Sequence, residues 1–410
     1  MLTVPVSRGG EVASAIHRIT YIYVNKRILP MSFASSTIAS RLLSLVTVLL
    51  VGLCQSCGTE SESAVFDSEA IYSRITRCDI ESVARSAPAF TALTLANPLT
   101  FLWEMLPLGD SVLILNQLYQ SDSNLLVHRI GAPQGSDYHL VGQGEGPNSV
   151  STITNLRSSA DSLYFFDPNM RTMHRMALGA GQAVQTVATV GALCQQAITW
   201  EGSVYCLPVD IGEVADSRFA RYSLEGTLDS AFGGFPPRHQ PMTGKVRYGP
   251  AGNNQAYQAD ARLSSDGEYL VLTYLSKDRL EIYGPGGRLL HATDGPDGFD
   301  PDFAATEGDA SGAGLSPLTD VTRIGYISVA VNAAGVYALY SGGLTNPSAP
   351  APGYRSFATT DLLVFDWNGA LRKSYTLPYA AHELAVTEGG TVYIASDDED
   401  VQIYRSMYPL

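Results

Sequence analysis

The sequence predicts an all-β fold, a six-bladed β-propeller with four-stranded antiparallel blades. The main observation is a repeat: six times along the chain, a turn-like cluster opens onto a short apolar stretch, most copies of which contain aromatic residues. Successive copies begin about 40 to 70 residues apart, which is the spacing of repeated sheet units in a propeller. Frequent turn formers agree with many short strands, since the 410 residues include 38 Gly and 22 Pro. The six copies are Asp110–Leu115, Asp161–Phe166, Gly202–Leu207, Gly267–Leu272, Gly335–Tyr340 and Gly390–Ala395.

Alternating apolar residues predict up to four strands in each repeat, named a to d from the axis outward. The expected strands of the fourth repeat are Tyr257–Leu263, Glu268–Leu275, Arg279–Tyr283 and Arg288–Thr293. Those of the fifth are Tyr326–Val331, Val336–Tyr340, Leu362–Phe365 and Leu371–Leu377. The second repeat gives Ser162–Phe166, Thr172–Met176 and Val184–Val190.

The sixth repeat is expected to lack its outer strand. It supplies only His382–Val386, Val392–Ala395 and Gln402–Tyr404. A spare apolar segment, Phe90–Leu95, lies before the first repeat. We expect this segment to become the missing strand, because that arrangement closes the ring and removes an exposed sheet edge.

The propeller is expected to span residues 65–410, preceded by segments of another kind. Leu42–Leu53 is a mostly apolar run behind Arg41, too short to cross a bilayer and typical of a signal peptide. We interpret residues 31–56 as a lipoprotein signal peptide and residues 1–30 as an over-extended N-terminus. Residues 57–64 are small and acidic, which is typical of a flexible tether.

Cys57 is the expected lipidation site. A Cys that follows a small residue at the end of an apolar run resembles the lipobox of bacterial lipoproteins. Ser56 precedes Cys57, whereas Cys54 follows the bulky Leu53. The sequence departs from the usual lipobox because Cys54 stands three positions before Cys57, where Leu is typical. An ordinary cleaved signal peptide with incidental cysteines is the alternative.

The charge of the chain argues against nucleic acid as a partner. Lys and Arg number 26 and Asp and Glu number 40, which gives a formal net charge of −14. An acidic protein repels phosphate backbones.

Segments of the last two repeats resemble the TolB-like six-bladed propeller lipoproteins of Gram-negative bacteria. They are Tyr326–Val329, Val336–Gly342, Leu363–Gly369 and Leu384–Val386. Gly142–Pro147 resembles the loop that enters a blade in that family and in NHL-like propellers. The resemblance covers residues 65–410 and is strongest after residue 260, while Leu113–Gln117 of the first repeat lacks the Tyr. It implies an exported, lipid-anchored propeller at the outer membrane or cell surface, and no particular reaction.

Three cysteines fall in the propeller region. Cys194 and Cys206 flank a predicted hairpin whose turn is Trp200–Ser203. In an exported protein this placement suits a cross-strand disulfide, and two buried free thiols are the alternative. Cys78 has no evident partner and is expected to be a small buried hydrophobe.

No motif identifies a catalytic site, so the catalytic residues stay unassigned. The seven His show no His-x-x-x-His or His-Glu-x-x-His spacing, and no Gly-x-Ser-x-Gly elbow is present. Gly142–Pro147 leads into a β-rich stretch rather than a helix, which argues against a phosphate-binding loop. Asp294–Asp302 and Asp397–Asp400 lack the EF-hand spacing and are interpreted as solvated loops. We therefore expect no metal site and no cofactor.

Loop lengths differ between the two faces of the predicted ring. The a–b and c–d turns are tight, whereas the long segments are Gly233–Asn254, Gly295–Thr322 and Gly342–Thr360. These three are d–a or b–c connections, which share one face of a propeller. We call it the long-loop face, and the opposite one the short-turn face. Long ordered loops carry function, so the long-loop face is the expected recognition surface.

A basic and aromatic cluster within the first long segment is the candidate binding site. Its members are Arg238, His239, Lys245, Arg247 and Tyr248. Positive charge concentrated on an acidic protein suits docking of an anionic or hydroxyl-rich partner. A solvated loop that balances nearby acidic residues is the alternative.

Two classes of function stay open. The leading hypothesis is a membrane-anchored binding or scaffold module whose partner is an unknown glycan, peptide or envelope protein. The alternative is a propeller enzyme, a metal-dependent lyase or lactonase-like hydrolase with its site near the axis. Carboxylates or imidazoles clustered on the inner strands would favour the enzyme, and small apolar residues would favour binding.

The lipidation hypothesis predicts the fate of a Cys57→Ala variant. The variant should move from the membrane to the soluble fraction, because lipid anchoring of the mature protein requires this thiol. Cys54→Ala is the matched control and should remain in the membrane fraction. Membrane retention of Cys57→Ala, measured by fractionation and immunoblotting, would contradict the hypothesis.

Overall fold

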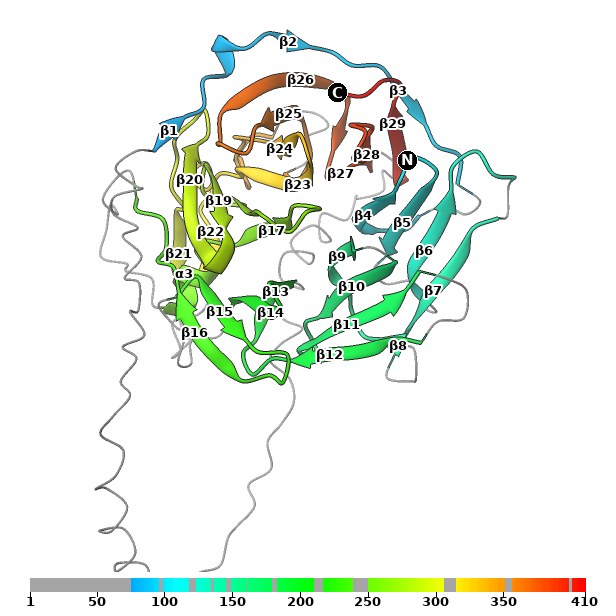
Figure 1. Cartoon of the computed structure of the whole chain (residues 1–410). Coiled ribbons are helices and arrows are strands. Elements are labelled where there is room, and N and C mark those ends of the chain that lie inside the picture. The colour runs from blue at the N-terminus through cyan, green and yellow to red at the C-terminus, as the bar shows by residue number, and fades with distance from the viewer. Residues whose placement is uncertain are drawn as a thin grey trace, which may run out of the picture. The chain divides into compact units, whose positions relative to one another are not determined.

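Six radial sheets form the propeller in the computed structural model (Figure 1). The structure describes residues 75–410, except 96–98, 118–122, 134–135, 145–148, 160, 179–182, 210–216, 239–249, 306–314, 351–355 and 398–399. The chain divides into residues 1–64 and Val65–Leu410, and the described residues all belong to the second unit. The expected signal peptide, Cys57 and the tether lie outside the described residues.

The first three blades follow the predicted plan of consecutive antiparallel strands. Blade 1 contains β4 (Leu102–Leu108), β5 (Val112–Gln117), β6 (Ser123–Arg129) and β7 (Tyr138–Gln143), with the short parallel β8 (Ser149–Val150) outside β7. Blade 2 contains β9 (Thr154–Ser159), β10 (Ser162–Asp167), β11 (Thr172–Ala177) and β12 (Gln185–Thr189). Blade 3 contains β13 (Cys194–Trp200), β14 (Ser203–Pro208), β15 (Phe219–Tyr222) and β16 (Leu228–Phe232).

The remaining blades complete the ring. Blade 4 contains β17 (Ala259–Leu263), β18 (Leu270–Tyr274), β19 (Arg279–Gly284) and β20 (Arg288–Asp294). Blade 5 contains β23 (Tyr326–Asn332), β24 (Gly335–Tyr340), β25 (Thr359–Phe365) and β26 (Leu371–Ala381). Blade 6 contains β27 (Glu383–Val386), β28 (Val392–Ser396), β29 (Gln402–Ser406) and β3 (Phe90–Ala92). The six-bladed, four-stranded architecture predicted from the repeat is therefore confirmed.

The N-terminal part of the propeller closes the ring. β3 pairs antiparallel with β29, so the outer strand of blade 6 comes from the start of the domain, as the spare segment predicted. The Leu93 N–H donates to the Ile403 carbonyl at 2.8 Å, and the Met407 N–H donates to the Ala89 carbonyl at 2.9 Å. Because these bonds join distant parts of the chain, they hold the last blade against the first.

The residues before β3 run along the rim of two further blades (Figure 1). β1 (Thr76–Arg77) pairs parallel with β20 of blade 4, and β2 (Arg85–Ser86) pairs parallel with β26 of blade 5. The Arg85 guanidinium forms an ion pair with Asp361, and Arg77 donates to the Pro296 carbonyl at 2.8 Å. β1, β2 and β3 together form an N-terminal belt that covers the outer edges of three blades.

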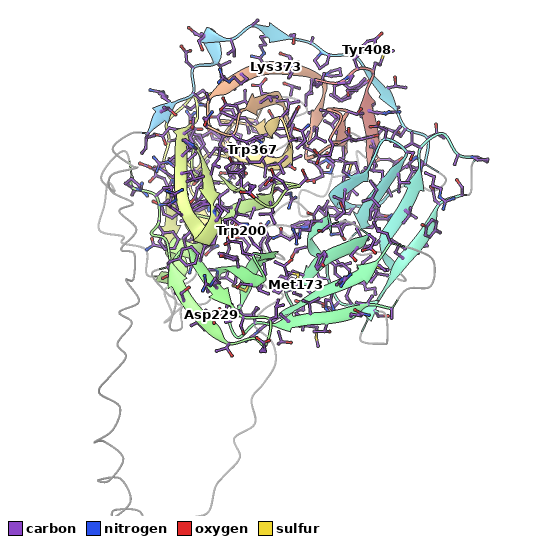
Figure 2. The ribbon with its side chains drawn as sticks, viewed as in Figure 1. Met173, Trp200, Asp229, Trp367, Lys373 and Tyr408 are labelled. Carbon is purple, nitrogen blue, oxygen red and sulfur yellow. A yellow bond between two sulfur atoms is a disulfide. The ribbon has the colours of Figure 1, made fainter. Side chains whose placement is uncertain are left out.

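Side chains fill the space between neighbouring sheets (Figure 2). Trp200 is buried between blades 3 and 4, where its indole N–H donates to the Gly267 carbonyl at 2.7 Å. Trp367 stacks on Tyr269 with ring centroids 4.9 Å apart, which joins blades 4 and 5. These two Trp residues therefore pack between blades, as expected for aromatic residues in a propeller.

The cysteines of the propeller fall into two groups. Cys194 on β13 and Cys206 on β14 form a disulfide with their Cα atoms 5.5 Å apart. Cys78 is a free, buried thiol whose pKa burial raises to about 12, so it is a thiol rather than a thiolate at neutral pH.

Helices are a minor part of the described residues. They are α3 (Pro250–Ala256) and the 3-10 turns η1 (Ile80–Ser82) and η2 (Pro285–Gly287), while a small hairpin pairs β21 (Phe303–Ala305) with β22 (Leu315–Pro317). Across the described part of the chain, no helix has the length and apolar character needed to cross a bilayer.

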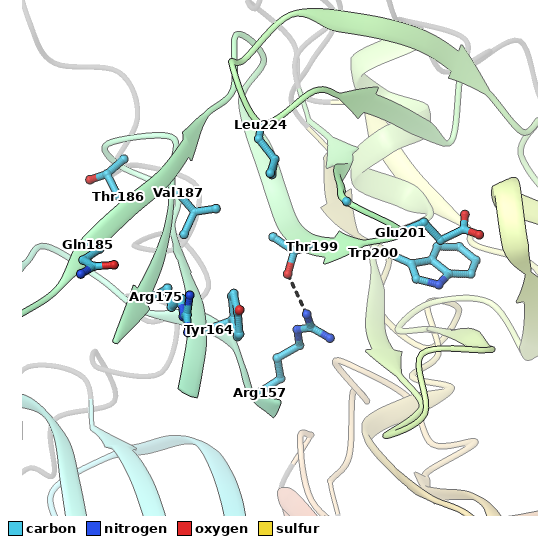
Figure 3. A pocket seen from close by; sticks show the side chains of 11 residues that line it. Arg157, Tyr164, Arg175, Gln185, Thr186, Val187, Thr199, Trp200, Glu201 and Leu224 are labelled. Carbon is cyan, nitrogen blue, oxygen red and sulfur yellow. Dashed lines mark hydrogen bonds between the residues drawn. The ribbon is translucent and has the colours of Figure 1, made fainter. Parts of the chain in front are cut away.

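A cavity of about 480 Å³ lies between blades 2 and 3 (Figure 3). Its lining includes Glu201 and Gly202 from the a–b turn of blade 3 and Leu224 from the c–d turn. These turns place the cavity, called the interblade cavity below, toward the short-turn face.

Ring closure through β3 predicts a position-specific effect of proline. The Leu93 N–H donates to β29, and the N–H groups along a strand of an antiparallel pair point alternately toward the partner and away from it. The Thr91 N–H therefore points toward β29, and the Ala92 N–H points away from it. Thr91→Pro should therefore lower the free energy of unfolding by about 1–3 kcal/mol. Ala92→Pro, at an equally exposed neighbouring position, should cost much less. Equal melting temperatures for the two variants would contradict closure by this strand.

Candidate functional site

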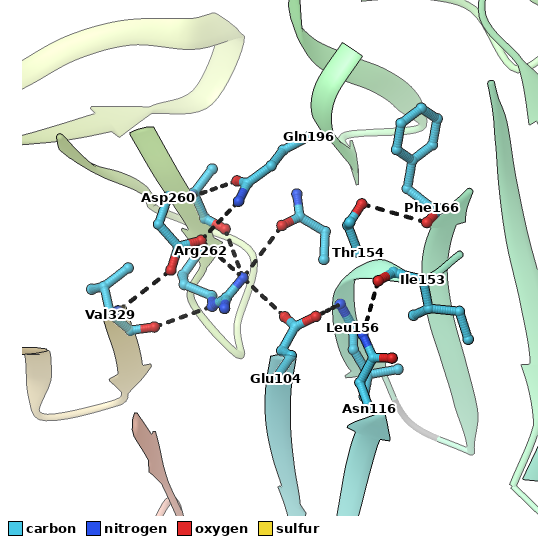
Figure 4. A network of polar contacts seen from close by, with 12 residues as sticks. Glu104, Asn116, Ile153, Thr154, Leu156, Phe166, Gln196, Asp260, Arg262 and Val329 are labelled. Carbon is cyan, nitrogen blue, oxygen red and sulfur yellow. Dashed lines mark hydrogen bonds and ion pairs between the residues drawn. The ribbon is translucent and has the colours of Figure 1, made fainter. Parts of the chain in front are cut away.

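Polar side chains from the innermost strands meet at the propeller axis (Figure 4). Neighbouring inner strands contact one another around the ring. Each has one edge paired within its blade and a second edge that faces the axis. Polar residues at this axis include Glu104 on β4, Asn155 on β9, Gln196 on β13, Asp260 and Arg262 on β17, and Glu383 on β27. We call this set the axial network.

Arg262 lies at the centre of the axial network. Its Nη1 lies 3.0 Å from Glu104 Oε1 and 3.2 Å from Asp260 Oδ1, and it donates to Asn155 Oδ1 at 3.3 Å. Its Nε donates to the Val329 carbonyl on β23 at 3.1 Å. One guanidinium thus bonds to residues from blades 1, 2, 4 and 5.

The same network satisfies backbone N–H groups at the axis. Glu104 Oε2 accepts from the Leu156 N–H at 3.0 Å, and Gln196 Oε1 accepts from the Ala261 N–H at 2.8 Å. Asp260 Oδ1 accepts from the Gln196 amide at 3.0 Å. Buried backbone donors need partners, so these side chains replace the ladder bonds that an inner edge lacks.

The axial network contains one guanidinium group and three carboxyl groups. Arg262 therefore cannot neutralise all three carboxylates, and this imbalance determines which of them is protonated. Burial disfavours a charge on Arg262, but Asp260, Glu104 and Glu383 outweigh that effect and raise the pKa of the guanidinium. Burial raises the pKa of Glu104, against the lowering effects of Arg262 and the Leu156 N–H. Burial also raises the pKa of Glu383 well above its usual range. We infer that Arg262 stays charged and that Glu383 is the carboxyl group that holds a proton.

The chemistry open to the axial network is limited by its own bonding. Glu104 and Asp260 direct their oxygens to protein donors, whereas Glu383 Oε1 is buried without a hydrogen-bond partner among the described residues. Within the described ranges, no three His, Cys, Asp or Glu side chains are arranged to hold a metal ion. The Glu383 carboxyl group, with Oε1 left without a donor among the described residues, is therefore the chemically distinctive feature of the axis.

The long segments form a second candidate site, because they bond to one another on the long-loop face. The Thr345 hydroxyl donates to the Thr322 carbonyl at 2.6 Å, and the Ser348 N–H donates to Asp320 Oδ1 at 2.7 Å. The Leu315 N–H donates to Gln255 Oε1 at 3.0 Å, which joins β22 to α3. The described parts of the three segments therefore form one cross-linked surface over blades 3 to 5.

Arg238 is the one member of the predicted basic cluster that lies among the described residues. Its Nη2 lies 2.5 Å from Asp302 Oδ1, and its Nη1 donates to the Pro301 carbonyl at 2.7 Å. Arg238 thus joins the first long segment to the second, and its charge is matched by a carboxylate. His239, Lys245, Arg247 and Tyr248 lie outside the described residues.

Buried ionic groups on the b–c turn of blade 4 anchor the second long segment. Lys277 is fully buried, and its Nζ donates to Asp300 Oδ1 at 2.6 Å. Asp278 Oδ2 accepts from the Asp297 N–H at 2.7 Å and the Gly298 N–H at 2.5 Å. Burial raises the pKa of Asp278 to about 6, although these two N–H groups act in the opposite direction. A Cβ at Gly295 would lie 1.5 Å from Asp278 Oδ1, so a larger residue there would displace this carboxyl group.

An exposed aromatic pair also lies on the long-loop side. Phe101 and Trp103 stack with ring centroids 6.2 Å apart and remain 40% and 39% exposed. Phe101 precedes β4, and Trp103 is the second residue of that strand. The d–a connection enters β4 at this end, which places the pair on the long-loop face. His382, at the entry to β27, lies on the same side, with its Nδ1 3.8 Å from Asp397 Oδ1.

The axial residues were not identified from the sequence, although a signal for them exists. Asp260 and Arg262 are charged residues two positions apart in an expected inner strand, and Glu383 stands alone in another. Charged side chains in a strand that a propeller encloses need partners. What the sequence lacks is the relation between blades, since Glu104 and Arg262 are far apart in the chain.

Comparisons with known proteins give only distant structural likenesses. Neither the models of known protein families nor the curated proteins give a match. Among solved structures, a DUF4221 family member from Bacteroides vulgatus has a TM-score of 0.47 at 9% identity, over 79% of this chain and 96% of that chain. A candidate exported protein of Bacteroides fragilis has a TM-score of 0.48 at 8% identity, over 81% and 98%. Streptogramin B lyase has a TM-score of 0.39 at 9% identity, over 77% and 97%. Likenesses this distant transfer no function to the chain.

The raised pKa of Asp278 predicts a pH-dependent effect of Asp278→Asn. Between about pH 4 and pH 6 the folded protein binds a proton at this carboxyl that the unfolded chain releases, so wild-type stability falls as the pH rises. The neutral amide avoids this loss. Relative to wild type, the variant should gain on the order of 2–3 kcal/mol from pH 4 to pH 7.

The readout is the difference in melting temperature between Asp278→Asn and wild type at each pH. A fixed cost of burying the amide shifts every point equally and leaves the slope unchanged. Asp278→Ala is the comparison, because it also removes the acceptor for two N–H groups and should be destabilising at every pH. A flat difference for Asp278→Asn would contradict the assignment.

Proposed function

We propose that this protein is an exported, membrane-anchored β-propeller of the TolB-like kind that acts as a binding or scaffold module. The resemblance of blades 5 and 6 to that family supports the kinship. The apolar run at Leu42–Leu53 and the lipobox-like context of Cys57 support lipid anchoring at the outer membrane or cell surface.

The observation that carries the binding function is the exposed Phe101–Trp103 pair on the long-loop face. The other two Trp residues pack between blades, which makes the exposure of Trp103 distinctive. Val321 in the second long segment and Phe357 in the third are also exposed, by 48% and 39%. Aromatic and apolar side chains on an ordered surface are typical of recognition sites.

The chemistry of this face suits an extended, hydroxyl-rich ligand such as a glycan. The apolar faces of sugar rings stack on aromatic side chains, and the neighbouring polar loops can bond to hydroxyl groups. A peptide or an envelope protein would use the same aromatic contacts and is distinguished by the experiment below.

An enzyme is the second candidate, favoured by the carboxylates of the axial network. Glu104, Asp260 and Glu383 are clustered on inner strands, which is the arrangement that would favour catalysis. A carboxyl group with a raised pKa is the usual form of a general acid. Binding remains the leading function because the oxygens of Glu104 and Asp260 are occupied by protein donors and Glu383 is only 6% exposed.

The experiment compares retention of ligands on immobilised wild-type and variant proteins. The ligands are a panel of soluble polysaccharides and, separately, solubilised outer-membrane proteins. Trp103→Ala should weaken retention about tenfold, because loss of a central aromatic contact typically costs 1–2 kcal/mol. The control is Tyr408→Ala, which removes an aromatic residue that is 71% exposed. Tyr408 follows the C-terminal end of β29 and lies near the short-turn face.

The outcomes separate the two functions. Retention that Trp103→Ala weakens and Tyr408→Ala leaves intact supports binding on the long-loop face. Equal retention by all three proteins, or by none, contradicts it. Turnover of a polysaccharide or lactone that Glu383→Gln abolishes without loss of melting temperature would establish the enzyme instead.

A further inference from the structure

A row of side chains crosses blade 2 on the wall of the interblade cavity. Arg157, Tyr164, Arg175 and Gln185 occupy directly paired positions on β9, β10, β11 and β12. Directly paired residues project from the same face of a sheet, so the four side chains stand side by side. All four line the cavity.

Two guanidinium groups lie close to one aromatic ring in this row. The Arg157 Cζ lies 5.0 Å from the centroid of the Tyr164 ring, and the Arg175 Cζ lies 5.9 Å from it. Contacts with an aromatic face stabilise a guanidinium without neutralising it. The wall therefore carries two positive charges near Tyr164.

Arg157 has no carboxylate partner among the described residues. Its Nη2 donates to the Thr199 hydroxyl at 2.8 Å, while its Nε is buried without a partner in the described part of the chain. Burial lowers the pKa of Arg157, because little replaces the solvation that this guanidinium loses. Arg175 donates through Nε to the Ser162 hydroxyl at 3.0 Å and lies 4.0 Å from the highly exposed Asp161 carboxylate. Among the described residues, Arg157 thus has no carboxylate partner, and Arg175 has only the solvent-exposed Asp161 at 4.0 Å.

The carboxylate nearest to the opposite wall points out of the cavity. Figure 3 shows the Glu201 and Trp200 side chains directed away from Arg157 and Tyr164. Glu201 Oε2 accepts from the Gly286 N–H of blade 4 at 2.7 Å and from the Tyr205 hydroxyl at 3.3 Å. Glu201 therefore lines the cavity without directing its carboxylate into it.

The rest of the lining is suited to an apolar group. Val187 and Leu224 face the space beside Tyr164 in Figure 3, and Leu224 is 38% exposed. A volume of about 480 Å³ lies within the usual range of sites for small organic ligands and exceeds the size of a bare inorganic anion. The cavity thus offers positive charge on one wall and an apolar surface beside it.

We propose that the interblade cavity binds a small organic carboxylate with an apolar body. Arg157 and Arg175 lie on either side of Tyr164 and attract the carboxylate, whose two oxygens match the planar donors of a guanidinium group. The apolar body packs against Tyr164, Val187 and Leu224. This site is separate from the proposed recognition surface, because it lies toward the short-turn face.

The test is calorimetric titration of the purified propeller with three probes. Phenylacetate carries the charge and the apolar body, phenylacetamide has nearly the same shape without the charge, and inorganic phosphate is a charge without the body. Phenylacetate should bind about tenfold to a hundredfold more tightly than phenylacetamide, since charge-assisted bonds to Arg are the stronger ones. Inorganic phosphate should bind more weakly than phenylacetate.

Matched variants locate the binding. Arg157→Met and Arg175→Met should each weaken phenylacetate binding about tenfold or more. Arg129→Met is the control, because Arg129 also lies over a Tyr ring, 5.6 Å from the centroid of Tyr138, but on blade 1 and outside the cavity. Melting curves check folding, and the 45% exposed Arg175 side chain keeps the comparison available if Arg157→Met does not fold.

Four results would overturn the proposal. The first is the absence of binding by phenylacetate at millimolar concentration, and the second is equal binding by phenylacetate and phenylacetamide. The third is tighter binding of phosphate than of phenylacetate, which would assign the site to a bare anion. Unchanged affinity in both Arg variants would place any binding elsewhere on the protein and also contradict the proposal.

Discussion

The structure depends on how the unpaired edges of the inner strands are satisfied. Every blade turns one strand edge toward the axis, where an N–H group out of contact with water needs a partner. Glu104, Gln196 and Asp260 accept from backbone or side-chain N–H groups of a neighbouring blade, and Arg262 holds two of these three side chains in position. Removal of one member from a buried ionic group costs about 3–5 kcal/mol. The axial network therefore acts first as the element that joins the blades.

The outer edges present the same physical problem and have a different solution. In the N-terminal belt, β1 and β2 pair with the outer strands of blades 4 and 5, and β3 is itself the outer strand of blade 6. Exposed strand edges invite association with other chains, so the belt protects the rim as well as closing the ring. With the axis and part of the rim occupied by internal bonds, the two faces and the spaces between blades remain for recognition. The aromatic pair on one face and the interblade cavity toward the other are the features that fit that role.

The fold was predictable because alternation and turn residues report local structure. Phe90–Leu95 was identified as the closing strand because it is apolar and the sixth repeat lacked a strand. β1 and β2 were missed, since Thr76–Arg77 and Arg85–Ser86 are short, polar and defined only by their partners. The Arg157–Tyr164–Arg175 row and the contacts of Arg262 depend on strand register and on the approach of distant blades. Neither can be deduced from residue spacing.

Hydrogen exchange of the amides at the axis tests the central claim most directly. Leu156 and Ala261 donate their N–H groups to side chains of other blades, and Val329 donates to Asp260 Oδ2 at 3.4 Å. If the axial network joins the blades, these amides should exchange only through global unfolding, as slowly as ladder amides such as those of β18. Rapid exchange at Leu156 and Ala261, with the β18 amides still protected, would show an axis open to water and contradict the account.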